Sequence, residues 1–539
     1  MRRAAVRVTG TMIEPRSSCW RCLWVTFVTF VSLWFIPQAA RAAAVASDHQ
    51  AAAPRAGGPH SVGYRKMLSF PRRPIQLRVP RLGRDVERVV LKNGMVLYVM
   101  EDHRLPIVRI SAILRAGSSF VPRDQEIAMS MLGGQLRQGG TTSRTFEQLN
   151  DALEFIGASV ETSTGAEQSS ASLDVLTRDV DMGVKLFTDV LMHPAFDPHQ
   201  LEIARGVAIE EIRRRNDEPG SIASRYFNRI LYTLGHPTGR AGFTTIAEVQ
   251  NVTRDQLIAL HRKYYGPNNL WLAVVGDFRK QAMIARLEDA FAGWAPIDVA
   301  AVAREKRQLP RASGKNEPGV FLIRRPLPQA TVVLGQFGVD RRNPDRFALL
   351  LMNDILGGGS FTSRLMARVR TQEGLAYDVG TEIDARGRDL GTFRAALETR
   401  TGTIGPAVRA VLAEIRRIRQ APVSERELAL VKDRFINSYI FRFESPLTNV
   451  VELMQLEYDG RPANYYETLL DKIRAVTRRD ILRVARTYLH PDQLTLLIVG
   501  DVREGDAQWS KFGRVTALTL ENPSAARDAD QKRANVNGS

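Results

Sequence analysis

Cysteine is almost missing from this 539-residue chain. The only two, Cys19 and Cys22, lie within residues 1–44. This segment starts with arginines, continues with an apolar run at 23–36 and reaches a small-residue motif at 40–42, the pattern of a cleaved signal peptide. The mature protein is therefore expected to be exported, periplasmic or secreted, and to contain no disulfide.

Long hydrophobic runs and negative charge are also scarce. The apolar run is shorter than the roughly 20 residues that span a bilayer, so no transmembrane segment is expected in the mature chain, with an uncleaved anchor as the alternative. Lys and Arg number 75 against 58 Asp and Glu, a net charge of +17. Nucleic acid, anionic lipid or acidic peptides would suit this charge. Because no finger, RNA-binding signature or aromatic-interleaved basic helix is present, we expect a basic soluble surface and no nucleic-acid partner.

Histidine is absent from residues 107 to 192. In the middle of this interval, residues 126–141 read EIAMSMLGGQLRQGGT and follow an alternating strand pattern at 107–114. Ile127, Met131 and Leu132 have helical spacing and predict a helix that faces the core. The pair Gly133-Gly134 lies inside that helix, where each glycine costs about 1 kcal/mol relative to alanine. The helix has neither the imidazoles nor the carboxylate that a metal-binding helix needs.

An internal repeat determines the predicted architecture. Val252-Thr253-Arg254 recurs as Val476-Thr477-Arg478, and Val275-Gly276-Asp277 recurs as Val499-Gly500-Asp501, both at an offset of 224 residues (476 − 252 and 500 − 276). A gap-free match over helix, loop and strand indicates duplication of one α+β domain. The predicted organisation is a signal peptide (1–44), a flexible lead-in (45–83), a first domain (84–294), a basic linker (295–318), a second domain (319–503) and a disordered tail (504–539).

Within the first domain the patterns predict a hairpin at 89–99 that turns at Asn93-Gly94 with type I′ geometry. Periodicity then predicts helices and strands in turn. The helices are 146–156, 180–191 and 198–215, and the strands are 158–163, 169–176 and 270–275.

Several motifs in this order resemble those of the insulinase/pitrilysin peptidases, family M16, and of its processing-peptidase-like members in particular. They are Leu114-Arg115-Ala116-Gly117-Ser118, Leu136 to Thr141, Gly235-His236-Pro237-Thr238-Gly239, Gly374-Leu375-Ala376-Tyr377 and the two Val-Gly-Asp endings. The resemblance covers roughly residues 86–502. It implies two duplicated α+β domains, each a mixed, mostly antiparallel sheet packed against helices, which form a clamshell around an inner chamber suited to unfolded peptides.

Active members of the family carry an H-x-x-E-H zinc motif on the first helix. Counted back from Gly139-Gly140-Thr141, Ser130 stands at the first histidine, Gly133 at the catalytic glutamate and Gly134 at the second histidine. The third ligand maps onto Glu211. One carboxylate does not hold catalytic zinc, so the resemblance implies no catalytic residue and no metal in this chain. We expect Glu210 and Glu211 to form a solvated helix edge, and the glycine pair either to pack loosely or to let a partner or substrate approach closely.

The remaining histidines offer no replacement ligands. They show no pairing at i, i+3 or i, i+4, so each is expected to be a surface or structural residue; they are His103, His193, His199, His236, His261 and His490.

The second half retains what the family uses to bind substrate. An Arg and a Tyr seven positions apart map onto Arg370 and Tyr377, where they would contact the peptide and help complete the site. The alternative is that Arg370 pairs with a nearby acid and Tyr377 is a half-buried strand residue. In the first half, the strand near 158–164 lies where relatives add a peptide as an extra strand. Its sequence Ser159-Val160-Glu161-Thr162 departs from the Asn-Ala pattern of active members, which weakens that prediction.

Three functions follow from the resemblance. The first is an inactive pseudo-peptidase subunit of an exported heterodimeric zinc metallopeptidase, whose partner carries the intact H-x-x-E-H motif and the zinc. The second is a non-proteolytic structural or peptide-binding scaffold with the same fold. The third, a stand-alone metallopeptidase, has the least support.

Overall fold

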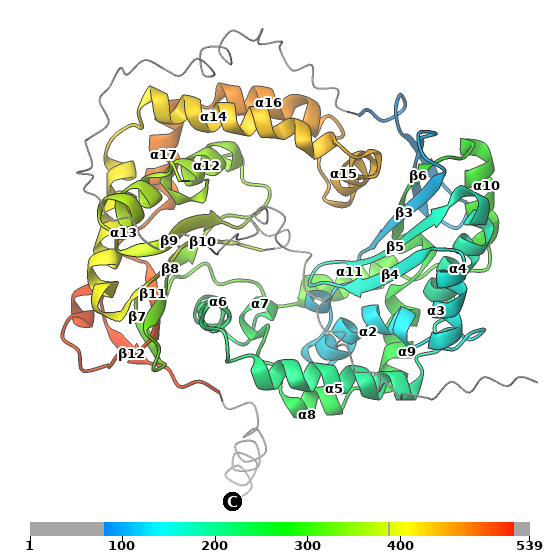
Figure 1. Ribbon diagram of the computed structural model, residues 1–539, viewed down its shortest axis with the longest axis horizontal. Helices are drawn as coiled ribbons and strands as arrows, with labels where there is room; N and C mark the ends of the chain where they lie inside the picture. The colour runs from blue at the N-terminus through cyan, green and yellow to red at the C-terminus, as the bar shows by residue number, and fades with distance from the viewer. Residues whose placement is uncertain (1–79, 360, 386–388, 522–539) are drawn as a thin grey trace, which may run out of the picture. The chain divides into compact units, whose positions relative to one another are not determined.

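The computed structural model describes residues 80–521 except 360 and 386–388. They form two six-stranded mixed sheets that helices cover (Figure 1). The first sheet contains β1 (Glu87–Val90), β2 (Val96–Glu101), β3 (Ile107–Leu114), β4 (Ser159–Thr164), β5 (Ser169–Leu176) and β6 (Leu270–Gly276). The second contains β7 (Gly319–Arg324), β8 (Gln329–Phe337), β9 (Ala376–Ile383), β10 (Thr392–Arg400), β11 (Thr495–Gly500) and β12 (Val515–Ala517).

Five strands of each sheet have the same arrangement, which confirms the predicted duplicated α+β fold. The sixth strand differs, because β1 is antiparallel to β2 whereas β12 is parallel to β7. The first has the order β1-β2-β6-β3-β5-β4 and the second β12-β7-β11-β8-β10-β9. In each, one inner pair is parallel (β2 with β6, β7 with β11) and the other inner pairs are antiparallel. β6 and β11 are fully buried, as expected for central strands covered on both faces. β4 and β9 are the equivalent outer strands.

The helices also follow the repeat. The first half contains α2 (Glu126–Gln138), α3 (Phe146–Phe155), α4 (Val180–Met192), α5 (Pro198–Arg214), α6 (Pro219–Tyr232), α7 (Pro237–Arg240), α8 (Ile246–Gln250), α9 (Arg254–Tyr264) and α10 (Lys280–Ala290). The second contains α12 (Arg346–Asn353), α13 (Ile404–Gln420), α14 (Glu425–Tyr439), α15 (Pro446–Tyr458), α16 (Tyr465–Ala475) and α17 (Arg478–Tyr488). Thr253 and Thr477 each close a capping box, on α9 and α17, so the repeated Val-Thr-Arg triplet is a repeated helix start.

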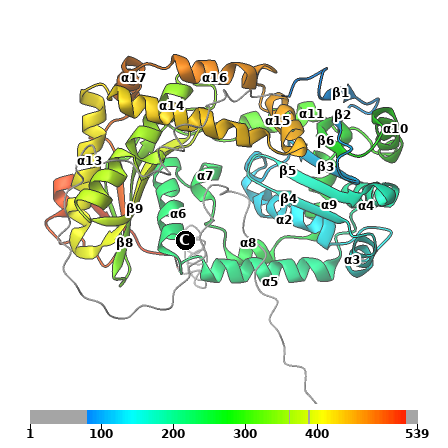
Figure 2. The same cartoon turned by 45° about the horizontal axis from the view of Figure 1, so that its top comes forward.

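Each half lends one helix to the sheet of the other. The apolar face of α6 packs on β8 and β11, where Ile222 and Phe227 join a core cluster with Val333. Conversely, α15 packs on β6 and β2 (Figure 2). Its Glu457 carboxylate accepts hydrogen bonds from Arg88 and Trp271. Sequence patterns did not reveal this exchange, because a helix that packs on a distant sheet has the same periodicity as one that packs on its own.

The predicted hairpin is present, but its turn is not type I′. Leu91 and Met95 pair across the loop, and the Gly94 amide donates to the Leu91 carbonyl at 2.9 Å. Only Gly94 in this loop has a positive φ, 88°, so the turn is type I followed by a left-handed glycine. The Asn93 side chain donates to the Phe291 carbonyl at 3.1 Å, which holds the loop against the following helical layer.

The predicted linker and tail are more ordered than expected. The linker contains the helix α11 (Val299–Gln308), on which Val302 is buried. The prediction of a disordered tail is wrong for residues 504–521: β12 pairs in parallel with β7 and completes the second sheet. Residues 1–44 and 522–539, and 45–79 of the lead-in, lie outside the described part of the chain. Among the residues described, no helix combines the length and apolar character needed to cross a membrane.

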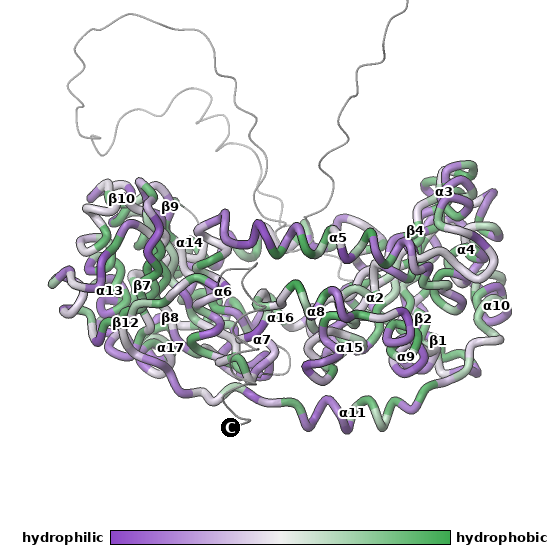
Figure 3. Tube along the Cα trace, turned by 90° about the horizontal axis from the view of Figure 1, so that it is seen from below, coloured by the Kyte–Doolittle hydropathy of each residue, from purple (hydrophilic) through white to green (hydrophobic). Residues whose placement is uncertain are grey.

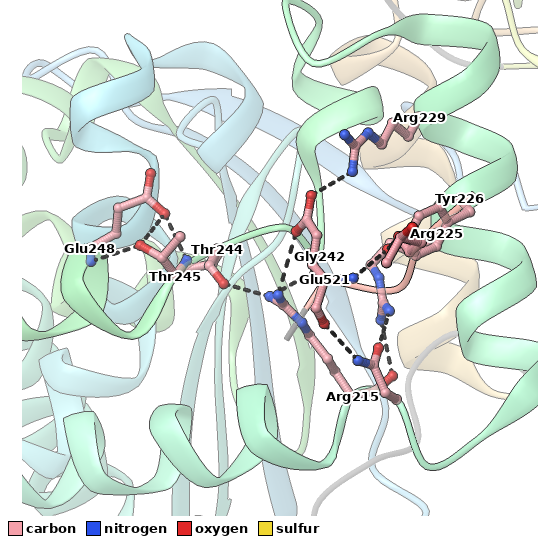
Figure 4. Close-up of polar contacts among 11 residues, drawn as sticks. Arg215, Arg225, Tyr226, Arg229, Gly242, Thr244, Thr245, Glu248 and Glu521 are labelled. Atoms are coloured by element: carbon pink, nitrogen blue, oxygen red, sulfur yellow. Dashed lines mark hydrogen bonds and ion pairs between the residues drawn. The ribbon is translucent and has the colours of Figure 1, made fainter. Parts of the chain in front are cut away.

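The tail continues from β12 to α6. Glu521 binds Arg229 and lies 3.6 Å from Arg215, while its amide donates to the Tyr226 hydroxyl at 2.9 Å (Figure 4). The Asn216 side chain donates to the Glu521 carbonyl at 3.0 Å. The segment after the second domain therefore fastens the exchanged helix of the first.

Candidate functional site

The degenerate motif lies on α2, as predicted. Ser130 is exposed, and its hydroxyl donates to the Ile127 carbonyl one turn earlier at 2.8 Å. The opposite side of the helix is apolar, with Met129 and Leu132 fully buried. Local periodicity thus suffices to orient α2, and the former first-ligand position faces away from the core.

Gly133 is in backbone contact with β4. A Cβ atom placed on it would lie 2.1 Å from the Thr164 amide nitrogen and 2.3 Å from the Ser163 carbonyl carbon. For Gly134, the only neighbour of such an atom within 4 Å is a Gln138 side-chain oxygen at 3.7 Å. The expectation of loose packing is therefore wrong at Gly133, and the close approach is made by the chain's own strand. A glutamate does not fit there without displacement of β4.

Hydroxyl groups that satisfy one another lie next to this contact. The Thr164 hydroxyl is 2.9 Å from that of Ser169, which in turn donates to the Ala116 carbonyl at 2.7 Å. The buried Tyr265 hydroxyl donates to Ser169 at 2.8 Å. Burial raises the pKa of Tyr265, which keeps this phenol neutral. The cluster is thus a hydrogen-bond network of hydroxyls and a backbone carbonyl, and it contains none of the imidazole, thiolate or carboxylate ligands that hold Zn²⁺.

Glu211 lies on α5 and is exposed to solvent. Its neighbour Glu210 forms an ion pair with Arg213, whereas Glu211 has no ion pair or hydrogen bond with the rest of the described chain. This is the solvated helix edge expected from the sequence. Within residues 80–521, gaps excepted, no cluster of three or more His, Cys, Asp or Glu side chains is placed to hold a metal ion. The absence of a metal from this protein stays a prediction.

Two of the remaining histidines are structural. His236 is buried, accepts a hydrogen bond from the Thr238 amide at 3.1 Å, and contacts Asp389 of the second half at 3.0 Å. His261 is buried against the Leu191 carbonyl at 2.8 Å, and burial lowers its pKa to about 4. A neutral ring with this partner supports the packing around α9.

Arg370 and Tyr377 lie together on the surface of the second half. Arg370 belongs to a π-helical segment, η6 (Met366–Gln372), and Tyr377 to the outer strand β9. The guanidinium carbon is 4.7 Å from the centre of the Tyr377 ring and 4.9 Å from that of Phe361. Such stacking contributes about 0.5–1 kcal/mol at an exposed site and fixes the direction of the guanidinium. The two predicted residues are therefore in contact.

The alternative interpretation of this pair, an Arg370 ion pair and a half-buried Tyr377, disagrees with the structure in both parts. No carboxylate of the described residues forms an ion pair with Arg370, and Tyr377 is 80% exposed rather than half-buried. The preceding arginine, Arg368, binds Glu373 at 2.8 Å and the buried Glu414 at 3.1 Å. These ion pairs anchor η6 and leave Arg370 to its aromatic neighbours.

Phe361 is a member of this site that the sequence reasoning missed. It is 71% exposed, and its ring centre lies 4.9 Å from the Arg370 guanidinium carbon. A signal was available, because an aromatic residue directly after the run Gly357-Gly358-Gly359-Ser360 is unusual for a solvent-exposed loop. We name Phe361, Arg370 and Tyr377 the aromatic–arginine cluster.

Comparison with known proteins assigns this arrangement first to a class, the two-domain α+β fold of metallopeptidases, and then to a family. Residues 131–240 match the family model of insulinase, peptidase family M16, and residues 251–435 match that of the peptidase M16 inactive domain. The chain belongs to the M16 family. Its second match and its degenerate motif fit an inactive member.

Some relatives that match over most of their length are named zinc proteases, and another is named a non-peptidase homolog. An uncharacterized zinc protease of Streptomyces coelicolor is 25% identical over 429 residues, which cover 78% of this chain and 91% of that protein. The non-peptidase homolog YmxG of Helicobacter pylori is 24% identical over 406 residues, 75% of this chain and 91% of that protein.

Solved structures support the fold. A peptidase M16 inactive domain from Pseudomonas fluorescens superposes with a TM-score of 0.68 at 23% identity and covers 78% of this chain and 98% of its own. The periplasmic protease PqqL of Escherichia coli gives a TM-score of 0.64 at 14% identity, over 80% of this chain and 48% of that one.

Proposed function

We propose that this chain is the inactive subunit of an exported M16-type zinc metallopeptidase and supplies peptide-binding residues to a partner that carries the zinc. The observation that supports this most directly is the contact of Gly133 with β4. The position of the general base has lost its carboxylate, and it also lacks the space for one. Catalysis then has to come from a second chain with an intact H-x-x-E-H motif.

The aromatic–arginine cluster is the part of the site that this subunit contributes. A guanidinium donates to peptide carbonyls, and a phenol can donate to the oxyanion that develops when water attacks the peptide bond. Tyr377 is exposed on an outer strand, so a substrate held by a partner can reach it. The cluster has no catalytic role without the partner's zinc, and unfolded peptides are the substrates that such an open site would accept.

The first test uses the purified mature chain alone. We expect far less than one zinc per chain by elemental analysis, and no chelator-sensitive cleavage of an unfolded reporter peptide. Stoichiometric zinc, or cleavage that a chelator abolishes, would show that the chain is itself a metallopeptidase.

The second test adds the partner, which pull-down and mass spectrometry should identify as a chain with intact H-x-x-E-H. Mixing is expected to raise the partner's kcat/KM, and Arg370→Ala with Tyr377→Phe is expected to lower that gain by about 10²-fold, the usual effect of removing an oxyanion donor. Arg426→Ala, an exposed arginine on α14, is the matched control and should leave the gain unchanged. Recovery of both chains from the periplasmic fraction tests export.

A structural or peptide-binding scaffold is the second candidate. It is favoured by the similarity to a relative named as a non-peptidase homolog. The same experiment separates the two functions, because a scaffold predicts partner binding with an activity that the double variant does not change.

A further inference from the structure

The protein contains a cavity of about 700 Å³ that shares no lining residue with the aromatic–arginine cluster. Its walls come from both halves and from the linker. The first half contributes the loop after β3, Glu167 and residues 268–271, the linker contributes α11 and Arg311, and the second half contributes residues 340–342 and 458–459. Its volume is within the range of small-ligand and peptide-side-chain sites.

The linker helix forms one wall of this cavity. Val299, Val302, Ala303, Lys306 and Arg307 line it, and these positions follow the helical spacing of a single face. Figure 3 shows α11 as a helix of mixed hydrophilic and hydrophobic residues that connects the two halves. The linker therefore connects the two halves and also forms part of the cavity wall.

The lining is strongly basic. Six cationic residues face three acidic ones; the cations are Arg115, Lys306, Arg307, Arg311, Arg341 and Arg342, and the acids are Glu167, Asp340 and Asp459. Arg341 forms ion pairs with both Glu167 and Asp459, and the six cations exceed the three acids by three charges (6 − 3). The remaining charge of the walls is positive.

Two of these cations have no carboxylate partner in the described chain. Arg115 lies over the Trp271 ring at 4.5 Å and the Tyr458 ring at 5.4 Å, and it donates to the Tyr458 carbonyl at 3.4 Å. Stacking holds its guanidinium in place while its charge stays uncompensated. Arg307 is exposed on α11 and takes part in no ion pair with any residue that the structure describes.

We propose that this cavity binds an acidic peptide segment. The cations come from three separate segments, which favours an extended ligand with several carboxylates over one compact anion. Arginine side chains bind phosphate as well as carboxylate, but compact phosphate sites often add the free amino terminus of a helix. Here the amino terminus of α11 is capped by Asp298, whose carboxylate accepts from the Ala301 amide at 2.9 Å, and α15 presents its carboxyl-terminal end at Tyr458. The site requires no partner subunit and no zinc, so it stands apart from the proposed function.

The test measures binding of a short fluorescein-labelled peptide of alternating Glu and Gly to the purified chain by fluorescence anisotropy. The same peptide with Gln in place of Glu is the reference ligand. We expect saturable binding of the Glu peptide that weakens at high ionic strength, and little binding of the Gln peptide. Equal binding of the two peptides would overturn the proposal.

Matched variants locate the site. Arg307→Glu and Arg115→Gln are each expected to weaken binding about tenfold or more, which corresponds to roughly 1.4 kcal/mol. Arg304→Glu makes the same charge change on the same helix outside the cavity and should alter affinity less than twofold. Equal losses in Arg304→Glu and Arg307→Glu would show a diffuse charge effect and refute the site. Displacement of the peptide by inorganic phosphate at lower concentration than by unlabelled peptide would refute the ligand class. Circular dichroism checks that every variant is folded.

Discussion

The two halves of this molecule carry the same glycine pair at the same place. Gly133-Gly134 and Gly357-Gly358 are separated by 224 residues (357 − 133), the offset of the sequence repeat. Gly133 touches the outer strand β4 at Thr164, and Gly357 touches the outer strand β9 at Thr381. The glycine that replaces the catalytic glutamate of the zinc motif therefore makes the same kind of contact, from a helix to the outer strand, that its counterpart makes in the second half.

The halves differ in what surrounds this contact. In the first half, α2 continues as a regular helix and β4 presents paired hydroxyls such as Thr164 and Ser169. In the second half, the helix passes into π-helical segments, and the partly exposed Arg370 stacks on the exposed Tyr377 of β9. At the same place in the repeat, the first half is closely packed and lacks the residues of the zinc motif, whereas the second half leaves the aromatic–arginine cluster accessible to solvent.

The largest expected effect comes from Gly133→Ala. Its Cβ would lie 2.1 Å from a backbone nitrogen of β4, which no side-chain rotation relieves, so we expect a loss of at least about 3 kcal/mol of unfolding free energy. Gly134→Ala is the matched control. It meets nothing closer than 3.7 Å and should stabilise the protein by up to about 1 kcal/mol. Urea unfolding followed by circular dichroism measures both, and equal stabilities would mean that the contact with β4 is not tight.

Gly357→Ala should have a smaller effect. Its Cβ would lie 2.8 Å from the Thr381 hydroxyl and 2.9 Å from a Leu365 methyl, side-chain atoms that can move, although the Thr381 amide is also at 2.9 Å. We expect a loss of about 2 kcal/mol by the same unfolding measurement. A loss larger than that of Gly133→Ala would reverse the comparison of the two contacts.

Removal of residues 513–539 tests the outer strand of the second sheet that has no counterpart of the same direction in the first. It deletes β12, and it also removes the contacts of Glu521 with Arg229 and Tyr226 on α6. Because those ion pairs are partly exposed and the strand is short, we expect a loss of about 2 kcal/mol, seen as a melting temperature lower by several degrees. Truncation after residue 521 keeps β12 and Glu521 and is the control against which the loss is measured.

The smallest effect concerns the two exchanged helices. Arg88, with help from Tyr98 and Trp271, lowers the pKa of Glu457 on α15 from 4.5 to about 2, whereas the face of α6 is apolar. A carboxyl with a depressed pKa contributes stability above its unfolded pKa and loses it as the pH falls from about 4.5 towards 2. The difference in unfolding free energy between the unmodified protein and Glu457→Gln should therefore become smaller as the pH is lowered from about 4.5 towards 2, as measured by urea unfolding. A stability difference that stays constant over this pH range would contradict the role of Arg88.

The site was predictable to the extent that its residues are close in sequence. Arg370 and Tyr377 are seven residues apart, and a short segment that leads into a strand brings them together. Phe361 escaped prediction because it reaches the same guanidinium from a preceding loop. The cavity beside α11 escaped as well, since Arg115, Arg307 and Tyr458 come from three distant segments that no local pattern connects.

The sequence by itself determined the duplication, the strands and helices of each half, and the loss of the zinc ligands, because each of these is written in local periodicity, in a constant offset or in residue identity. Only the tertiary structure decided that Gly133 touches β4, that α6 and α15 exchange sheets, and that the tail supplies β12. These features depend on contacts between distant segments. Most of them involve backbone atoms, which leave no periodic pattern in the side chains.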